Sequence, residues 1–413
     1  MKFTCNWPVN KNGSLKVLLV NMVLITSTFV WYFYAFDMLT QSVKQINPEY
    51  VELLAIWSSH FGAAVISAFL GANISIKMEK KMHFLYGWLL LEFFASFSNF
   101  LLNNPNLLSL LFISSFIGAS FGLGMPVCMG YFRNSTFLEE RARLGGLIFF
   151  SNGPWYLLLG ITNVWDVTSK TLILASWRGL WLLALILLKP SEQVIYKSKE
   201  LSYIEIIRTR DFTLYYIPWW MLCLVNYLNV PTLIKSFGEA FYRFSTLIEG
   251  VLAGFFSIIG GYLSDINGRK RTVILGFTML GLGYATLGLY PKSLVSWWFY
   301  TIVDGVAWGF FYVLFLLTIW GELAHHALCE KYYALGGLPF FLSNYLKIMI
   351  APYISGIFSV YTVFSLASFF LFLAVIPLMY APETLPERKL RERELRSYIE
   401  RAKRIREKFT KGQ

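Results

Sequence analysis

Charged residues are scarce in this sequence of 413 residues, because Asp, Glu, Lys and Arg together make up 15% of it. Soluble domains average roughly 25% of such residues, and a disordered chain combines high charge with low hydrophobicity. Apolar residues instead reach 56%, aromatic residues 18% and mean hydropathy +0.54. This composition excludes both classes and predicts a multi-pass membrane protein.

Cysteine is also rare. Cys5, Cys128, Cys223 and Cys329 are widely scattered, with no C-x-x-C pair and no histidine at metal-ligand spacing. A disulfide framework or a zinc site is therefore not expected, and we predict no metal and no cofactor. The sequence also lacks a G-x-x-x-x-G-K-[ST] motif, which argues against ATP-driven pumping within this chain.

Long apolar runs dominate the chain up to residue 382. A helix needs about 20 mostly apolar residues to cross a bilayer. The first run, 15–36, is longer than a signal-peptide core and lacks a cleavage site, so we expect it to remain as the first span. The sequence predicts an all-α membrane protein with twelve transmembrane helices. They begin near Leu15, Val51, Met82, Leu107, Leu144, Thr171, Phe212, Phe244, Thr272, Trp297, Tyr333 and Tyr361.

The net charge of +12 would suggest a nucleic-acid partner in a soluble protein. Here most of the 36 Lys and Arg residues precede the first span, lie in alternate loops on one side, or follow the last span. By the positive-inside rule both termini are cytoplasmic. We expect a multi-pass plasma-membrane protein that works as a monomer within the lipid bilayer and binds no nucleic acid.

Two pairs of segments recur about 190 residues apart. Residues 71–81 align with 261–271, and residues 139–147 align with 330–338. The repeat predicts two six-helix bundles in parallel orientation, an architecture suited to alternating access around a site at mid-membrane. The expected division is an N-terminal bundle 1–190, a cytoplasmic linker 191–210, a C-terminal bundle 211–382 and a basic amphipathic cytoplasmic tail 383–413.

The segment 261–271 reads Gly-Tyr-Leu-Ser-Asp-Ile-Asn-Gly-Arg-Lys-Arg. It resembles the G-x-x-x-D-x-x-G-R-[KR]-[KR] loop of the major facilitator superfamily, and the resemblance extends over residues 1–385. Pro382-Glu383-Thr384 and the acid Glu322 are similar to features of the sugar-porter and organic-ion branch. The seventh span, 215–226, lacks the paired glutamines of many hexose carriers, so a sugar substrate does not follow.

The resemblance implies a cytoplasmic gate at these loops. Glycines let helix ends approach, and Asp265 can accept bonds from a helix N-terminus or an arginine in one state. The alternative is a basic loop that serves only topology. Ser75 occupies the position equivalent to Asp265 and cannot form an ion pair, so we expect a weaker contact there. The predicted gate residues are Gly261, Asp265, Gly268, Arg269, Lys270, Arg271, Gly71, Ser75, Glu139, Arg141, Glu322 and Glu383.

Ionisable residues inside spans are costly and are candidates for function. Glu92 and Arg178 lie at similar depth in the third and sixth spans, which are neighbours in the family. We predict a structural ion pair between them.

Glu249, Asp304 and Lys347 share mid-membrane depth in the C-terminal bundle. A lysine beside a carboxylate can exchange partners as a proton arrives, although a static buried salt bridge is the alternative. The candidates for substrate contact or proton coupling are Asp304, Lys347, Glu249, Trp308, His60 and Asp37. A structural histidine at His60 and a solvated interfacial acid at Asp37 remain open alternatives.

The sequence therefore predicts a secondary transporter that moves a small polar or organic solute, of the sugar or organic-ion class, by alternating access with proton coupling. The alternatives are a non-transporting nutrient sensor on the same fold and an exporter of drugs or metabolites. An enzyme is not expected, because the spans hold neither a His/Asp/Glu cluster nor a Ser–His pair.

Overall fold

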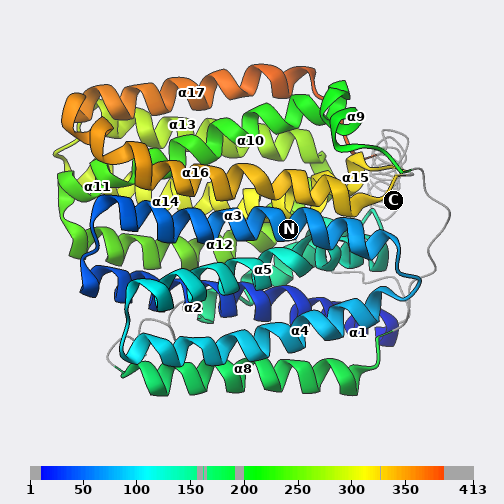
Figure 1. Cartoon of the computed structure of the whole chain (residues 1–413). Helices are drawn as coiled ribbons and strands as arrows, with labels where there is room; N and C mark the ends of the chain where they lie inside the picture. Colours follow the sequence, from blue (N-terminus) through cyan, green and yellow to red (C-terminus); the bar gives the residue numbers. More distant parts are fainter. Residues whose placement is uncertain (1–10, 156–160, 162–164, 191–199, 326, 386–413) are drawn as a thin grey trace, which may run out of the picture.

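The computed structural model describes residues 11–155, 161, 165–190, 200–325 and 327–385 (Figure 1). Its regular structure in these ranges is helical. We call the helices before residue 190 the N-terminal set. They are α1 (Lys11–Asn21), the π-helical η1 (Met22–Thr26), α2 (Ser27–Ile46), α3 (Tyr50–Ile76), α4 (Lys81–Ser98), the 3-10 helix η2 (Asn99–Asn103), α5 (Leu107–Ser135), α6 (Arg141–Phe150) and α8 (Val167–Leu188).

The helices after residue 200 form the C-terminal set. Its first helix, α9, begins inside the predicted linker, where Ser202 and Glu205 form a Ser-x-x-Glu capping box. The set comprises α9 (Tyr203–Arg208), α10 (Arg210–Leu228), α11 (Val230–Phe237), α12 (Glu239–Asn267), α13 (Arg269–Leu289), α14 (Leu294–Phe311), the π-helical η3 (Tyr312–Thr318), α15 (Ile319–Leu323), α16 (Cys329–Ile357) and α17 (Val360–Tyr380).

Ten helical stretches among the described residues are long and apolar enough to cross a membrane. They match ten of the twelve expected spans. The expected fifth and eleventh spans correspond to α6 and α16, which are not among these ten. The predicted all-α membrane fold is confirmed. The predicted amphipathic helix in residues 386–413 lies outside the described residues.

The helices run side by side, with α4 and α8 at one edge, α13 and α17 at the opposite edge, and α3, α5, α12 and α16 between them (Figure 1). The two sets meet where α16 packs on α3 and α5 and where α12 packs on α6. We call the end where α4, α6 and α13 begin the basic end; it is at the right in Figure 1.

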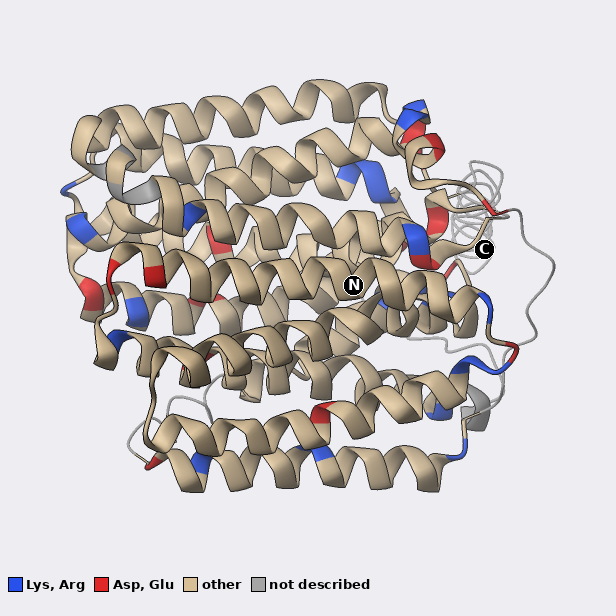
Figure 2. Cartoon of the chain, in the orientation of Figure 1, with Lys and Arg blue, Asp and Glu red and all other residues tan. Residues whose placement is uncertain are grey.

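Charged residues gather at the two ends of the helices, and the middle of the molecule is largely uncharged (Figure 2). Large apolar side chains are exposed on its outer surface, among them Leu187, Val295 and Leu108, which are 80%, 78% and 77% exposed. Such a surface is expected where lipid replaces water, since helices satisfy their own backbone hydrogen bonds.

Candidate functional site

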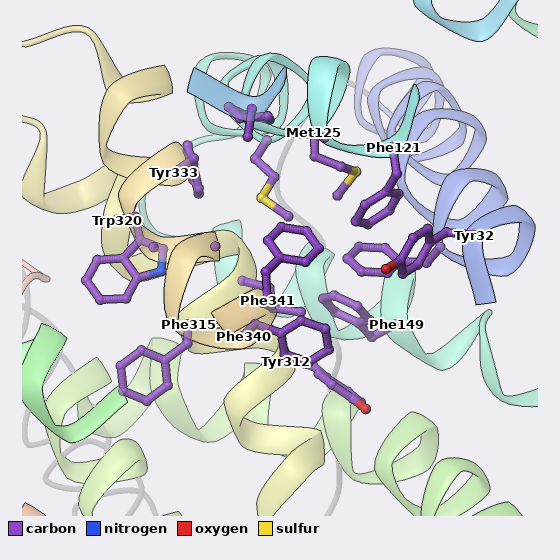
Figure 3. Close-up of a pocket in the computed structure, with 18 of the residues that line it drawn as sticks. Tyr32, Phe121, Met125, Phe149, Tyr312, Phe315, Trp320, Tyr333, Phe340 and Phe341 are labelled. Atoms are coloured by element: carbon purple, nitrogen blue, oxygen red, sulfur yellow. The ribbon is translucent and has the colours of Figure 1, made fainter. Parts of the chain in front are cut away.

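A cavity lies between the two helix sets (Figure 3). It holds about 930 Å³ of space free of protein atoms, part of which is open to solvent. Aromatic rings from both sets form much of its wall, including Tyr32, Phe121 and Phe149 from the N-terminal set and Tyr312 and Phe341 from the C-terminal set. Among the described residues that line it, none carries a formal charge.

Two polar groups of the N-terminal set reach this wall. Asn152 is 5% exposed, and its Oδ1 atom has no hydrogen-bond partner. The hydroxyl of Tyr32 lies 3.0 Å from Nε2 of His60, whose Nδ1 lies 2.9 Å from the carbonyl oxygen of Ser114. A carbonyl can only accept, so Nδ1 carries the proton and Tyr32 donates to Nε2. His60 thus orients a ring of the wall without lining the cavity itself.

The other residues predicted to contact substrate or couple protons also lie off the wall of the cavity. Asp304 is 4% exposed, and its Oδ1 atom has no partner. A Cβ atom on the next residue, Gly305, would lie 3.1 Å from the backbone oxygen of Glu249, which precedes the wall residue Gly250. Trp308, one turn after Asp304, packs on the wall residue Tyr312 with ring centroids 5.2 Å apart. The acids therefore lie behind the aromatic wall.

Lys347 and Asp37 lie apart from these two acids. The ammonium of Lys347 lies 5.3 Å from the ring centroid of Tyr227. No ion pair within the described part of the chain includes Lys347, so the predicted exchange with a carboxylate has no contact here to support it. Asp37 is exposed and accepts a 2.7 Å bond from Gln41, the environment of a solvated interfacial acid.

Glu92 and Arg178 form an ion pair between α4 and α8, and both side chains are fully buried. The guanidinium also donates to the hydroxyls of Ser27 and Thr28. The rings of Trp31 and Trp88 lie 6.0 and 5.8 Å from it. These contacts join α8 to α4 and to the start of α2, as expected of the predicted pair.

Asp265 joins the two helix sets at the basic end. Its Oδ2 accepts bonds from the backbone N and from Nε of Arg143 in α6, both at 3.0 Å. Its Oδ1 accepts a 2.5 Å bond from Arg269. Close approach of the two helices permits this, because a Cβ atom on Gly261 would lie 2.3 Å from the carbonyl oxygen of Ala142.

Glu322 at the end of α15 forms a second junction. It accepts bonds from Arg269 at 3.2 Å and from Arg141 of the N-terminal set at 3.3 Å. The hydroxyl of Thr384 also donates to it at 2.5 Å. Arg269 reaches back to the carbonyl oxygen of Leu138 at 2.8 Å. Three segments of the C-terminal set and one loop of the N-terminal set thus share one buried network.

Glu383 holds the start of α13. Its carboxylate accepts bonds from the backbone N of Arg269 at 2.8 Å and of Lys270 at 3.1 Å, as expected for an anion at a helix N-terminus. Burial raises the pKa of Glu383 above its usual value, although the backbone N–H groups oppose this shift. Gly268 has a φ of +99°, and a Cβ atom there would lie 2.4 Å from Glu383.

The remaining predicted gate residues make local contacts. Ser75 donates to the carbonyl oxygen of Ala72 in its own helix. A Cβ atom on Gly71 would lie 1.8 Å from the carbonyl oxygen of Leu123, so this glycine lets α3 approach α5. The carbonyl of Glu139 accepts a bond from Arg143. Arg271 is exposed.

Sequence reasoning missed an ion pair across the helix sets. Lys81 at the start of α4 pairs with Glu330 in the first turn of α16, and both side chains are buried. Nearby, Arg133 donates to the carbonyl oxygens of Gly321 and His325. Both residues lie in segments of the internal repeat, Lys81 at the end of 71–81 and Glu330 at the start of 330–338, but the repeat does not align these two segments with each other. Lys81 thus ties the loop of Ser75 to the other set.

The opposite end has fewer polar contacts between the sets. Lys44 pairs with Glu239 at 2.7 Å, with both side chains more than half exposed. The hydroxyls of Ser58 and Tyr345 lie 2.7 Å apart. In the described residues, the buried ionic contacts between the sets are therefore at the basic end, which is closed in this conformation.

These features describe a helical membrane fold with two helix sets, a cavity between them and ionic contacts between the sets at one end. The sequence model of the Major Facilitator Superfamily matches residues 212–410. This match covers just under half of the chain, in the C-terminal set, and the superfamily consists of membrane transporters. No curated protein sequence matches the chain.

Three solved structures share the fold at low sequence identity. A structure of the proton:xylose symporter XylE has 16% identity and a TM-score of 0.69, covering 91% of this chain and 97% of that one. The human organic anion transporter TETRAN has 10% identity and a TM-score of 0.68, covering 90% and 100%. The E. coli fucose:proton symporter FucP has 11% identity and a TM-score of 0.71, covering 88% and 98%.

Proposed function

We propose that this chain is a secondary transporter that moves a small organic solute across a membrane by alternating access, with coupling to protons. The observation that carries the proposal is the cavity, which both helix sets line, together with the ion pairs that join the sets at the basic end through buried carboxylates. In this proposal residues 1–190 and 211–382 are the two bundles, joined by 191–210, and the basic end is cytoplasmic.

Opening of the basic end requires three ionic contacts to separate together. These are Arg143–Asp265, Arg141–Glu322 and Lys81–Glu330. Each holds a carboxylate that is at most 1% exposed, so separation replaces a low-dielectric pair by hydrated charges. A solute that binds the open and closed states unequally shifts this equilibrium by its difference in affinity.

Asp304 and Glu249 are the proposed proton site. Asp304 is buried with an unpartnered oxygen, and a Cβ atom on its neighbour Gly305 would lie 3.1 Å from the backbone oxygen of Glu249. Two carboxylates on facing turns of neighbouring spans repel each other when both are charged, so we expect this pair to favour binding of one proton. Trp308 and Tyr312 link the acids to the wall of the cavity by ring contact. A proton bound there can therefore alter the packing of the wall.

The similar structures support this proposal. Two of them are structures of proton symporters for xylose and fucose, and one is of an organic anion transporter. We further propose a plasma-membrane location and a functional monomer. The cavity wall, rich in aromatic rings and free of charge, argues for an organic solute with apolar surface over a sugar.

The test uses the full chain in proteoliposomes. A ligand found by thermal shift should show counterflow, which requires alternating access but no ion gradient, and should accumulate under an imposed pH gradient. Asp304→Asn should retain counterflow and lose accumulation driven by the gradient, whereas Asp37→Asn, which changes an exposed acid, should retain both. Saturable binding without counterflow would assign the chain as a sensor. Equal accumulation of the ligand with and without the pH gradient would reject proton coupling.

A further inference from the structure

Lys347 is a cation that no carboxylate pairs with among the residues that the structure describes. It lies in α16, the expected eleventh span, and is half-buried with its ammonium over the ring of Tyr227 at 5.3 Å. The ion pairs of the described residues leave it out, and neither Glu249 nor Asp304 is bonded to it. A charged side chain within a span is costly unless it is paired or faces a functional cavity. The ring of Tyr227 compensates only part of this cost.

Lys347 lies on the same face of α16 as the residues that line the cavity, but further along the helix. Gly336, Gly337 and Phe340 of this helix line the wall. Lys347 follows Phe340 by seven residues, which returns it to the same helix face about 10 Å further from the basic end. Tyr227, under the ammonium, packs on Phe340 with ring centroids 5.4 Å apart. The cation therefore lies beyond Phe340 on this face, at the side of the cavity opposite the basic end, with Tyr227 between it and the wall residue.

Asn344 lies between Phe340 and Lys347 on this face. It is 7% exposed, and its Oδ1 atom has no hydrogen-bond partner. Since the oxygen and nitrogen of a carboxamide can exchange places by rotation, this group can offer either an acceptor or a donor to a ligand. The carboxamide of Asn344 and the ammonium of Lys347 therefore form a polar strip on this helix face. Both groups lack a full set of hydrogen-bond or ionic partners among the described residues.

The lining of the cavity is suited to bind the aromatic ring of a ligand. Phe149, Tyr312 and Phe341 project toward it from both helix sets (Figure 3). Ring faces and edges contribute favourable contacts to another aromatic group. A sugar would need hydrogen bonds for its hydroxyls, and a wall dominated by ring and methionine side chains supplies few of them.

We propose that the transported solute is an aromatic monoanion, with its ring in the cavity and its anionic group held by Lys347 and the carboxamide of Asn344. This proposal rests on the proposed function and specifies its substrate class. The long side chain of Lys347 can place its ammonium toward the cavity while its methylene groups stay on apolar surface. Entry of the anion supplies the missing countercharge and so favours the loaded state.

The test compares two probes of matched shape. Naphthalene-2-sulfonate is anionic and naphthalene-2-sulfonamide is its neutral counterpart. The purified full chain in nanodiscs should bind the sulfonate at least about tenfold more tightly, as expected for hydrogen bonds to a charged group. Lys347→Gln should remove this preference and leave sulfonamide binding unchanged, which also shows that the variant is folded. Lys347→Arg should keep the preference, and Phe341→Ala should weaken both probes.

Equal affinity of the wild type for both probes, or no saturable binding of either, would overturn the proposal. So would an unchanged preference in Lys347→Gln. Spin-label distances across the two ends of the bundle, measured without any ligand, report alternating access separately. Opening and closing without selectivity for the sulfonate would reject the substrate class alone. A single rigid conformation with a selective site would reject transport and leave the anion site intact.

Discussion

The substitution Asp265→Asn tests whether the contacts at the basic end form a gate. It keeps the shape of the side chain and removes its charge. Asp265 is fully buried and accepts two 3.0 Å bonds from Arg143 across the helix sets. Arg269, its other partner, still pairs with Glu322 in the variant. The change therefore weakens the contact between the sets without leaving a buried charge alone.

The expected magnitude follows from the geometry of this contact. Bonds to a charged group contribute about 1.5–3 kcal/mol, roughly twice the contribution of neutral bonds. Loss of the charge should therefore remove about 1–2 kcal/mol from the closed state, a shift of about 5–30-fold toward the open state. The side chain of Arg143 is 39% exposed, so solvent screening places the expected shift near the lower limit.

The assay measures spin-label distances across the basic end. Lys80 and Arg271 are exposed residues of the two helix sets, and labels on cysteines introduced there should separate more often in Asp265→Asn. Transport should fall while membrane insertion stays intact. Lys44→Gln is the control, since its pair at the opposite end is exposed and contributes about 0–1 kcal/mol. Wild-type distances and transport kinetics in Asp265→Asn would refute the gate.

Three further predictions concern packing and buried pairs. Reversal of either charge at Glu92 or Arg178 should cost about 3–5 kcal/mol of stability, and reversal of both should restore folding, measured by detergent-solubilised yield and thermal unfolding. Lys81→Met and Glu330→Met should each destabilise the closed basic end, and the double variant should recover much of this loss, read from spin-label distances. Gly261→Val should force α12 away from α6 and lower transport, because even a Cβ atom there meets a backbone oxygen at 2.3 Å.

Each of these has a result that contradicts it. A double reversal no better than the single ones would show that Glu92 and Arg178 do not stabilise each other. Additive effects of the two methionine variants would show the same for Lys81 and Glu330. Gly62→Val is the control for the third prediction, since a Cβ atom at Gly62 meets no atom within 4 Å. Equal transport in the two glycine variants would reject the need for close approach at Gly261.

The depth of a residue along its span could be predicted from the sequence. The direction in which its side chain points around the helix axis could not. Counting from helix ends placed Glu92 and Arg178 at one depth, and the structure brings them together. The same counting grouped Lys347 with Glu249 and Asp304, which the structure does not join in the described residues. Equal depth says nothing about rotation around the helix axis, and rotation decides which side chains meet.

The contacts at the basic end could be predicted in part, because the motif from Gly261 to Arg271 is local in the sequence. The spacing from Gly261 to Arg271 identified the loop, and the resemblance pointed to Glu322 and Glu383. Arg143, which holds Asp265 across the two sets, was not predicted. The pair of Lys81 and Glu330 was missed as well, since its partners are 249 residues apart in the sequence. Such pairs form only when the two helix sets dock.

The sequence alone determined the class of this protein. Scarce charge and long apolar runs require helices in lipid, because a bilayer offers the backbone no other hydrogen-bond partners, and the spacing of one loop points to the superfamily. The tertiary structure alone decided where the cavity lies. A cavity exists only where side chains of separate helices fail to fill the space between them, and that depends on how α3, α5 and α6 face α12 and α16.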